Sequence, residues 1–553
     1  VSPIALFDEL CILAGRLNLS LEAACSDTMY HFIRKCASFG MILSQSYKDP
    51  EERFQYEFPQ SKRDKFRQRF ISLSYEINRK RMKQFTHTYA SISLDEGSTL
   101  KTPYLDYVLH NTKKKLGEYV ADTREMTGGK AEDYIETIPK GLLYIEKYNI
   151  NVSTVVVDGN TAQLKAFKKS FPKSLRYSEN PMIKHLIVVP CLCHRINNAY
   201  KFAIQHDSRF KSLIDRMREI ASFLSESDSS FNKCPKFIDT RWIYDFDILR
   251  YLKKNLEGIN TFLEKHEKAL ITEDILDLEN MLMILKKLIL IFEDPNQSLS
   301  TSYKIIESAL DAFEEAESIS QNSDFYRQVR NSLKAYTINS KEGGLLLLSY
   351  VLTPEGLKDI NDRKNGSKRK KGSLKDFQFH QNKIQQDTED SNLDFVKETI
   401  IKEFYEPESS NAEPTSTVSS IDAESYYQRC SSTMSKICET LELSQEQHEN
   451  VMKALDAYLL SELPKICEHF RETLDKKSWN WEIIYEDERF KDFADIALRL
   501  EPTPCSEASA ERAISLQRLI ILKRRNKALK ELIDARLIYM RCQNKKFIDY
   551  YYL

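Results

Sequence analysis

The sequence predicts an α/β domain with the element order β-β-β-α-β-α-β-α, followed by a large all-helical region. The chain of 553 residues contains only 14 glycines and 16 prolines, about 5% together against a usual figure of about 12%, which is typical of long helices joined by few tight turns. Strand patterns are confined to residues 88–205. From about residue 211 to residue 500 amphipathic helical patterns replace them.

Five stretches of the α/β part have strand patterns, and they cover residues 90–95, 104–110, 116–122, 152–157 and 185–190. The first three are short and close together, so an antiparallel meander is the economical arrangement. The fourth ends in three consecutive valines, which is typical of a central strand buried on both faces. Helical patterns cover residues 130–148, 161–171 and 191–205. We expect the first of these helices to bend or break at Pro139.

Charge is balanced overall but not locally. Lys and Arg number 81 against 82 Asp and Glu, a net charge of -1, so attraction to nucleic acid must come from local patches. Residues 61–83 carry nine basic and two acidic side chains, and residues 512–546 carry eleven and two. Either segment is a solvated basic helix or a phosphate-contacting surface. The basic run 368–371 is likewise either a solvated loop or a DNA-contacting or nuclear-localisation tract.

Cysteine usage argues against a disulfide-bonded framework, and hydropathy argues against a membrane-spanning protein. The eleven cysteines are scattered through the chain without a paired Cys-x-x-Cys finger, which is typical of reduced thiols in the cytosol or nucleus. The longest apolar stretches, 344–352 and 281–292, are too short or too charged to cross a bilayer, which needs about 20 residues. We therefore expect no membrane span.

Two aspartates each follow a predicted strand. Asp95 closes the first strand and Asp158 the fourth, and α/β sheets place their ligands at such carboxyl ends. If these strands are neighbours, both side chains project into one crevice, where carboxylates repel unless divalent cations share their charge. Two such ions can activate an attacking oxygen and stabilise a leaving one in phosphodiester chemistry. Taken singly, either aspartate is more often a simple turn or helix cap.

Several motifs occur in a characteristic order. They are FPQSKRDKF (58–66), SISLDEGST (91–99), TPYLDYVLH (102–110), VVVDGNTAQLKAF (155–167), CLCHRINNA (191–199), DTRW (239–242), FADIALRLEPTPCSEASAERAIS (493–515) and KRRNKALKELIDARLIYMR (523–541). Together they resemble the hAT superfamily of cut-and-paste DNA transposases. The resemblance spans most of the chain, and the order and spacing of the motifs are more specific than any one of them.

The resemblance implies a ribonuclease-H-like catalytic domain interrupted by a large helical insertion. Residues 1–84 would form an N-terminal helical region for DNA binding or oligomerisation, and 85–206 the first part of the catalytic domain. Residues 207–500 would be the all-α insertion, and 501–553 would return as the catalytic helix and tail.

By the same resemblance, Asp95, Asp158 and Glu511 form the catalytic triad and hold two Mg²⁺ or Mn²⁺ ions. Glu507 lies one helical turn before Glu511, so spacing alone does not choose between the two glutamates. The Glu-Arg-x-x-Ser context chooses Glu511.

The resemblance also assigns residues to DNA. His194 would contact the scissile phosphate or strand, and Trp242 would stack on a flipped base. Arg241 would be a phosphate contact or a structural ion-pair partner. The basic residues Lys523, Arg524 and Arg525 would contact the DNA backbone.

A metal site at Cys191 and His194 is an alternative. Cys-x-Cys-His without a second pair is poor spacing for structural zinc, so a packed apolar role for Cys191 is favoured.

The function implied is that of a nuclear DNA transposase. It would hydrolyse a phosphodiester at the transposon end, form hairpins on flanking double-stranded DNA, and join the excised ends to target DNA as a homodimer or larger homo-oligomer. The alternative is a domesticated, non-catalytic DNA-binding or scaffold protein, against which the intact carboxylates argue. Two departures from the family pattern, Gly97 in place of a frequent tryptophan and Ile514 in place of phenylalanine, are expected to affect packing more than chemistry.

Overall fold

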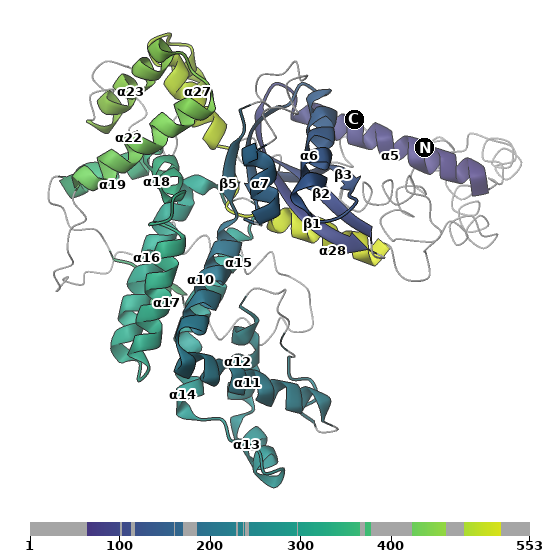
Figure 1. Cartoon of the computed structure of the whole chain (residues 1–553), viewed down its shortest axis with the longest axis vertical. Coiled ribbons are helices and arrows are strands. Elements are labelled where there is room, and N and C mark those ends of the chain that lie inside the picture. Colours follow the sequence, from purple (N-terminus) through teal and green to yellow (C-terminus); the bar gives the residue numbers. More distant parts are fainter. Residues whose placement is uncertain are drawn as a thin grey trace, which may run out of the picture.

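The computed structural model describes residues 63–99, 102–111, 117–159, 161–169, 185–227, 230–235, 237, 243–295, 297–364, 371–377, 423–460 and 480–520. Over these residues the fold is helix-rich, with one small mixed sheet of five strands. Figure 1 shows long helices extending away from the sheet on one side and a further group of helices beside its β5 edge.

The strands are β1 (Tyr89–Thr99), β2 (Thr102–Asn111), β3 (Gly117–Glu125), β4 (Asn151–Val157) and β5 (Ile187–Pro190). They lie in the order β3-β2-β1-β4-β5. The first three form the antiparallel meander that the sequence predicts, and β4 and β5 run parallel to β1. The predicted order of strands and helices is therefore confirmed, and the first and fourth strands are neighbours.

One face of the sheet packs on three helices: α5 (Arg63–Gln84), α6 (Ala131–Glu146) and α7 (Thr161–Lys169). Alternate strand residues such as Leu94 and Val155 are buried against them, as the period of two along a strand requires. Helix α6 runs unbroken through Pro139, so the prediction of a break was wrong. Its buried stripe of Tyr134, Ile138, Leu142 and Ile145 offsets the hydrogen bond that the proline removes.

Helix α28 (Ala508–Ile520) covers β1, β2 and β3 on the opposite face. Ala510 and Ala513 pack directly on Val108 and Val120, because small side chains let the helix lie close to the strands. At the edge of this contact Arg512 forms an ion pair of 2.6 Å with Glu118 of β3. The predicted helix over 506–546 is thus described as far as residue 520.

The helical region is built from α10 (Leu192–His206), α11 (Ser208–Glu226), α12 (Tyr244–Lys254), α13 (Leu256–Lys265), α14 (Glu273–Leu276), α15 (Glu279–Phe292), α16 (Leu299–Ile319), α17 (Ser323–Tyr336), α18 (Gly343–Val351), α19 (Pro354–Lys364), η1 (Leu374–Phe377), α22 (Ala423–Thr440), α23 (Gln445–Leu459), α26 (Trp481–Tyr485) and α27 (Lys491–Leu500). Local signals start several of them. The Asp207 carboxylate accepts hydrogen bonds from the first backbone amides of α11, and Ser444 forms a capping box with Gln447 at α23, as expected of N-cap residues.

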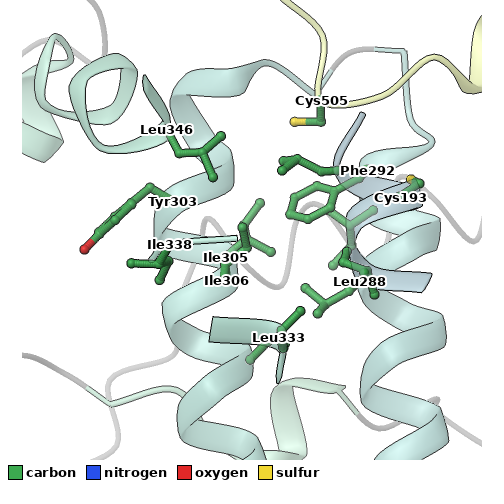
Figure 2. Packing of buried hydrophobic residues seen from close by; sticks show 14 of the residues in the cluster. Cys193, Leu288, Phe292, Tyr303, Ile305, Ile306, Leu333, Ile338, Leu346 and Cys505 are labelled. Atoms are coloured by element: carbon green, nitrogen blue, oxygen red, sulfur yellow. The ribbon is translucent and has the colours of Figure 1, made fainter. Parts of the chain in front are cut away.

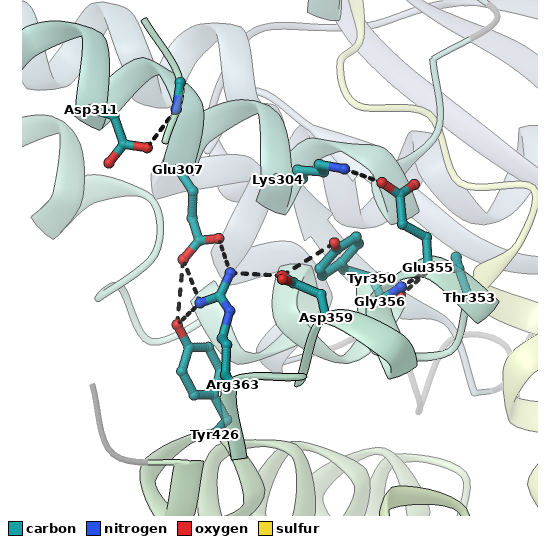
Figure 3. A network of polar contacts seen from close by, with 11 residues as sticks. Lys304, Glu307, Asp311, Tyr350, Thr353, Glu355, Gly356, Asp359, Arg363 and Tyr426 are labelled. Carbon is teal, nitrogen blue, oxygen red and sulfur yellow. Dashed lines mark hydrogen bonds and ion pairs between the residues drawn. The ribbon is translucent and has the colours of Figure 1, made fainter. Parts of the chain in front are cut away.

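One hydrophobic core runs from β4 and β5 through α10 into the helical region. Figure 2 shows its centre, where Cys193 of α10, Phe292 of α15 and Cys505 lie around one another. A polar network ties α16, α19 and α22 together, with Arg363 paired to Glu307 at 2.8 Å and to Asp359 at 2.7 Å (Figure 3). Among the described helices none is long and apolar enough to cross a membrane.

Gly97 of β1 and Ile514 of α28 lie against each other. A Cβ atom added to Gly97 of β1 would lie 2.2 Å from Cγ2 of Ile514 on α28, closer than packed atoms can approach. The missing side chain on the strand therefore makes room for the isoleucine and lets α28 lie against β1.

We expect Gly97→Ala to destabilise the protein by about 1–3 kcal/mol, because the added methyl group overpacks this contact. Ile514→Ala in the same chain should relieve the clash, so the double variant should be more stable than the sum of the two single effects predicts. Thermal or denaturant unfolding of the four proteins measures this. If Gly97→Ala stabilises the protein by about 0.4–1 kcal/mol, as an unhindered replacement of glycine does, the close contact is refuted.

Candidate active site at the carboxyl ends of the parallel strands

The strand register brings Asp95 and Asp158 together. Leu94 of β1 pairs with Val157 of β4, so each aspartate is the next residue of its own chain segment. Leu94 and Val157 belong to the core beneath α6, and side chains alternate between faces. Asp95 and Asp158 therefore follow on the opposite face, the one that α28 covers. The first and fourth strands are neighbours, which is the condition under which the sequence predicts that both aspartates project into one crevice.

A third segment ends at the same place. Val157 pairs with Pro190 of β5, and the backbone amide of Cys191 donates a 2.7 Å hydrogen bond to the carbonyl of Val157. Helix α10 starts directly after Cys191, so His194 lies in its first turn. Asp158 and His194 thus follow the carboxyl ends of β4 and β5, and Asp95 lies on β1 just after its parallel pairing with β4 ends. Strand β1 itself continues to Thr99, so the prediction that Asp95 closes this strand was wrong.

Residues 501–507, here called the strap, carry the chain from α27 to α28. The strap is held by backbone contacts on both sides. The Cys505 carbonyl accepts from the amide of Leu192 at 3.0 Å, and the Thr503 carbonyl accepts from the amide of Leu299 at 2.8 Å. The hydroxyls of Thr154 and Thr503 are 2.8 Å apart. These contacts fix the start of α28, where the amide of Glu511 donates to the carbonyl of Glu507 at 3.2 Å.

The acidic side chains around Asp95 raise one another's pKa values. Burial, together with the charge of Asp158, raises the pKa of Asp95 to about 7. Burial, together with the charge of Asp95, raises the pKa of Glu511 to about 8. Burial also raises the pKa of Glu507, with Asp95 contributing. All four acidic groups therefore belong to one electrostatic cluster, which includes Glu511.

His194 is the cationic partner in this cluster. Its Nδ1 lies 2.7 Å from Oε1 of Glu507, and 24% of its side chain is exposed. Burial alone would lower its pKa, but hydrogen bonds with Cys191 and Glu507 raise it to about 12. The resulting positive charge lowers the pKa of both Asp95 and Glu511, so His194 partly compensates the acidic groups.

The side chains of this cluster differ in how closely their potential ligand atoms lie. Among the described residues, the group whose potential ligand atoms all lie within 4.8 Å of one another is Cys191, His194 and Glu507; Asp95, Asp158 and Glu511 are not such a group. One ion could not be shared by all three carboxylates without movement.

Other residues predicted from the sequence lie outside this cluster or outside the described residues. Arg241, Trp242, Lys523, Arg524 and Arg525 fall on residues that the structure does not describe. In the basic tract 61–83, Arg69 of α5 pairs with Glu76 at 3.2 Å. In the basic run 368–371, Nζ of Lys371 lies 3.4 Å from a carboxylate oxygen of Glu314.

Sequence reasoning missed Asp106. It lies directly opposite Asp95 on β2, is fully buried, and its charge also raises the pKa of Asp95. Its Oδ1 accepts a hydrogen bond from the Thr123 hydroxyl at 2.5 Å, which holds the carboxylate in place. The alternation along 102–110 already placed a carboxylate there, but only the strand register shows what it faces.

No protein-family model matches this chain, and no curated protein matches it.

We expect Asp95→Asn to stabilise the metal-free protein at pH 8. The pKa of Asp95 is 3.8 ordinarily and about 7 in the fold, so the unfolded chain loses this proton at lower pH than the folded one. The wild type therefore loses stability as pH rises from about 4 to about 7, and asparagine removes this loss. The gain should be about 1–3 kcal/mol at pH 8 and should shrink toward pH 4.

Chemical unfolding in EDTA at several pH values measures this gain. Asp324→Asn is the matched control, since Asp324 is 75% exposed and should give little pH-dependent change. A destabilising effect of Asp95→Asn at pH 8 would show that Asp95 is favourably paired instead.

Proposed function

We propose that this protein is a metal-dependent DNA transposase of the hAT type, with Asp95, Asp158 and Glu511 as the ligands of two Mg²⁺ or Mn²⁺ ions. The observation that carries the proposal is the meeting of acidic side chains from β1, β4 and α28 on one face of the sheet. The order β3-β2-β1-β4-β5, with an antiparallel half and a parallel half, agrees with a ribonuclease-H-like catalytic domain. The helices between α10 and α28 would be its insertion.

The donor set fits divalent cations. Hard cations such as Mg²⁺ prefer carboxylate oxygens, and the raised pKa values of Asp95 and Glu511 record buried acidic groups that lack sufficient positive charge around them. When bound, two ions supply electrostatic stabilisation of the attacking and leaving oxygens of a phosphodiester. Each carboxylate must release its proton to bind them, so metal affinity should rise with pH.

The protein's own residues would hold and orient the DNA. His194 is partly exposed beside Asp95, so its ring can donate a hydrogen bond to a phosphate oxygen. In the proposed reaction, water first displaces the 3′-oxygen at one strand of the transposon end. The released 3′-hydroxyl then attacks the opposite strand to form a hairpin, and the excised 3′ ends attack target DNA.

Further parts of the proposal rest on the resemblance. Trp242 would stack on the base that leaves the duplex when the hairpin forms, with Arg241 beside it on phosphate. Lys523, Arg524 and Arg525 would contact the backbone, and binding should weaken with salt accordingly. Action on DNA in a nucleus, by a homodimer or larger assembly, belongs to the same proposal.

The test is nicking of a supercoiled plasmid that carries the DNA flanking the protein's own gene, with Mn²⁺ or Mg²⁺ and with EDTA. We expect metal-dependent nicks at the element's ends. Asp158→Asn and Glu511→Gln should each lower the rate by about three orders of magnitude or more, as loss of one member of a catalytic unit does.

Asp324→Asn, on the exposed surface of α17, should cut as well as the wild type. Equal cutting by Asp158→Asn and the wild type would overturn the proposal. Tight binding of this DNA without any cutting in Mn²⁺ would instead favour the non-catalytic DNA-binding protein.

A further inference from the structure

We propose that Cys191, His194 and Glu507 form a zinc site beside the two-ion site. This site would be distinct in ligands and in metal from the carboxylates that the proposed transposase chemistry uses. The inference rests on the three side chains themselves and does not depend on the proposed function.

The three potential ligands come from two segments that lie far apart in the sequence. Cys191 is the residue before α10, His194 lies in the first turn of that helix, and Glu507 ends the strap. One ligand atom from each lies within 4.8 Å of the other two. Ligands of one tetrahedral zinc ion stand about 3.3–3.8 Å apart, given metal–ligand distances of about 2.0–2.3 Å. Small side-chain movements would therefore place an ion among them.

The chemistry of the donors selects the metal. A thiolate, an imidazole and a carboxylate offer sulfur, nitrogen and oxygen, a mixed set that suits zinc and other borderline transition metals. Mg²⁺ and Ca²⁺ prefer oxygen ligands alone and should avoid a site with Cys191. Three protein ligands leave a fourth position open, as in zinc sites that keep a water or substrate.

The burial of Glu507 is an independent indication of a cation. Its side chain is fully buried, and among the described residues its Oε2 has no hydrogen-bond partner. A carboxylate so placed is costly unless a positive charge compensates it. His194 supplies part of this charge through its contact of 2.7 Å with Oε1. A divalent ion in place of the proton between His194 and Glu507 would supply more positive charge.

Zinc at this position would act on the neighbouring elements. It would link the β5–α10 junction to the strap, and so fix the start of α28 at Ala508, three residues before Glu511. The Nδ1 atom of His194 faces Glu507 and is buried, whereas part of the ring is exposed. With zinc on Nδ1, the other ring nitrogen carries the proton and remains a donor toward solvent or DNA.

The experiment measures the metal in the full-length protein purified without chelator, then dialysed against ZnCl₂ and freed of excess ion. Elemental analysis should give about one tightly held zinc per chain for this site. Replacement by Co²⁺ should give a thiolate-to-cobalt charge-transfer band. Cys191→Ser should abolish this band, and Glu507→Gln, which keeps the side-chain shape, should lower zinc affinity at least about tenfold.

Two controls separate this site from others. Cys430→Ser removes a buried thiol on α22, and Asp95→Asn changes the two-ion site; both should retain the zinc and the cobalt band. Circular dichroism shows whether each variant is folded. A wild-type protein that binds no zinc after loading overturns the proposal, as does zinc that survives both Cys191→Ser and Glu507→Gln, since that ion is bound elsewhere.

Discussion

The hydrogen bonds of the strap are the constraint on which the site depends. Residues 501–507 lie between β4 and the helical region and are bound to both, to β4 through the Thr503 hydroxyl and to α10 and α16 through the Cys505 and Thr503 carbonyls. These contacts fix the start of α28, and the packing of α28 on β1, β2 and β3 fixes the rest of the helix, so that Glu507 and Glu511 meet Asp95. The register of β1 and β4 fixes two acidic groups, and the strap delivers the others from a distant part of the sequence.

The arrangement has an electrostatic consequence. Acidic groups on β1 and β2, after β4 and on α28 influence one another, and the positive charge of His194 lowers the pKa values of Asp95 and Glu511. Like charges in such proximity destabilise a fold unless protons or cations neutralise them. Binding of the proposed cations would remove this repulsion. The fold maintains the cluster through the large core that α10 shares with the helical region.

Much of the sheet could be predicted from the sequence, because strand alternation and the valine run before Asp158 are local signals. In the predicted helix 130–148, only the break expected at Pro139 was mispredicted, because packing of α6 outweighs one lost hydrogen bond. Glu511 could be chosen only through the resemblance, since the strap is held mainly by backbone groups that leave no side-chain pattern. The meeting of Cys191 with Glu507 was missed for the same reason. The contact of Gly97 with Ile514 could not be predicted either, because the two residues lie far apart in the sequence.

The most direct measurement of the central claim is anomalous diffraction from crystals of the protein grown with Mn²⁺. The account predicts two anomalous peaks about 3.5–4 Å apart, with oxygens of Asp95, Asp158 and Glu511 among their ligands. No manganese between these carboxylates at saturating concentration, with all three side chains well ordered, would contradict the account.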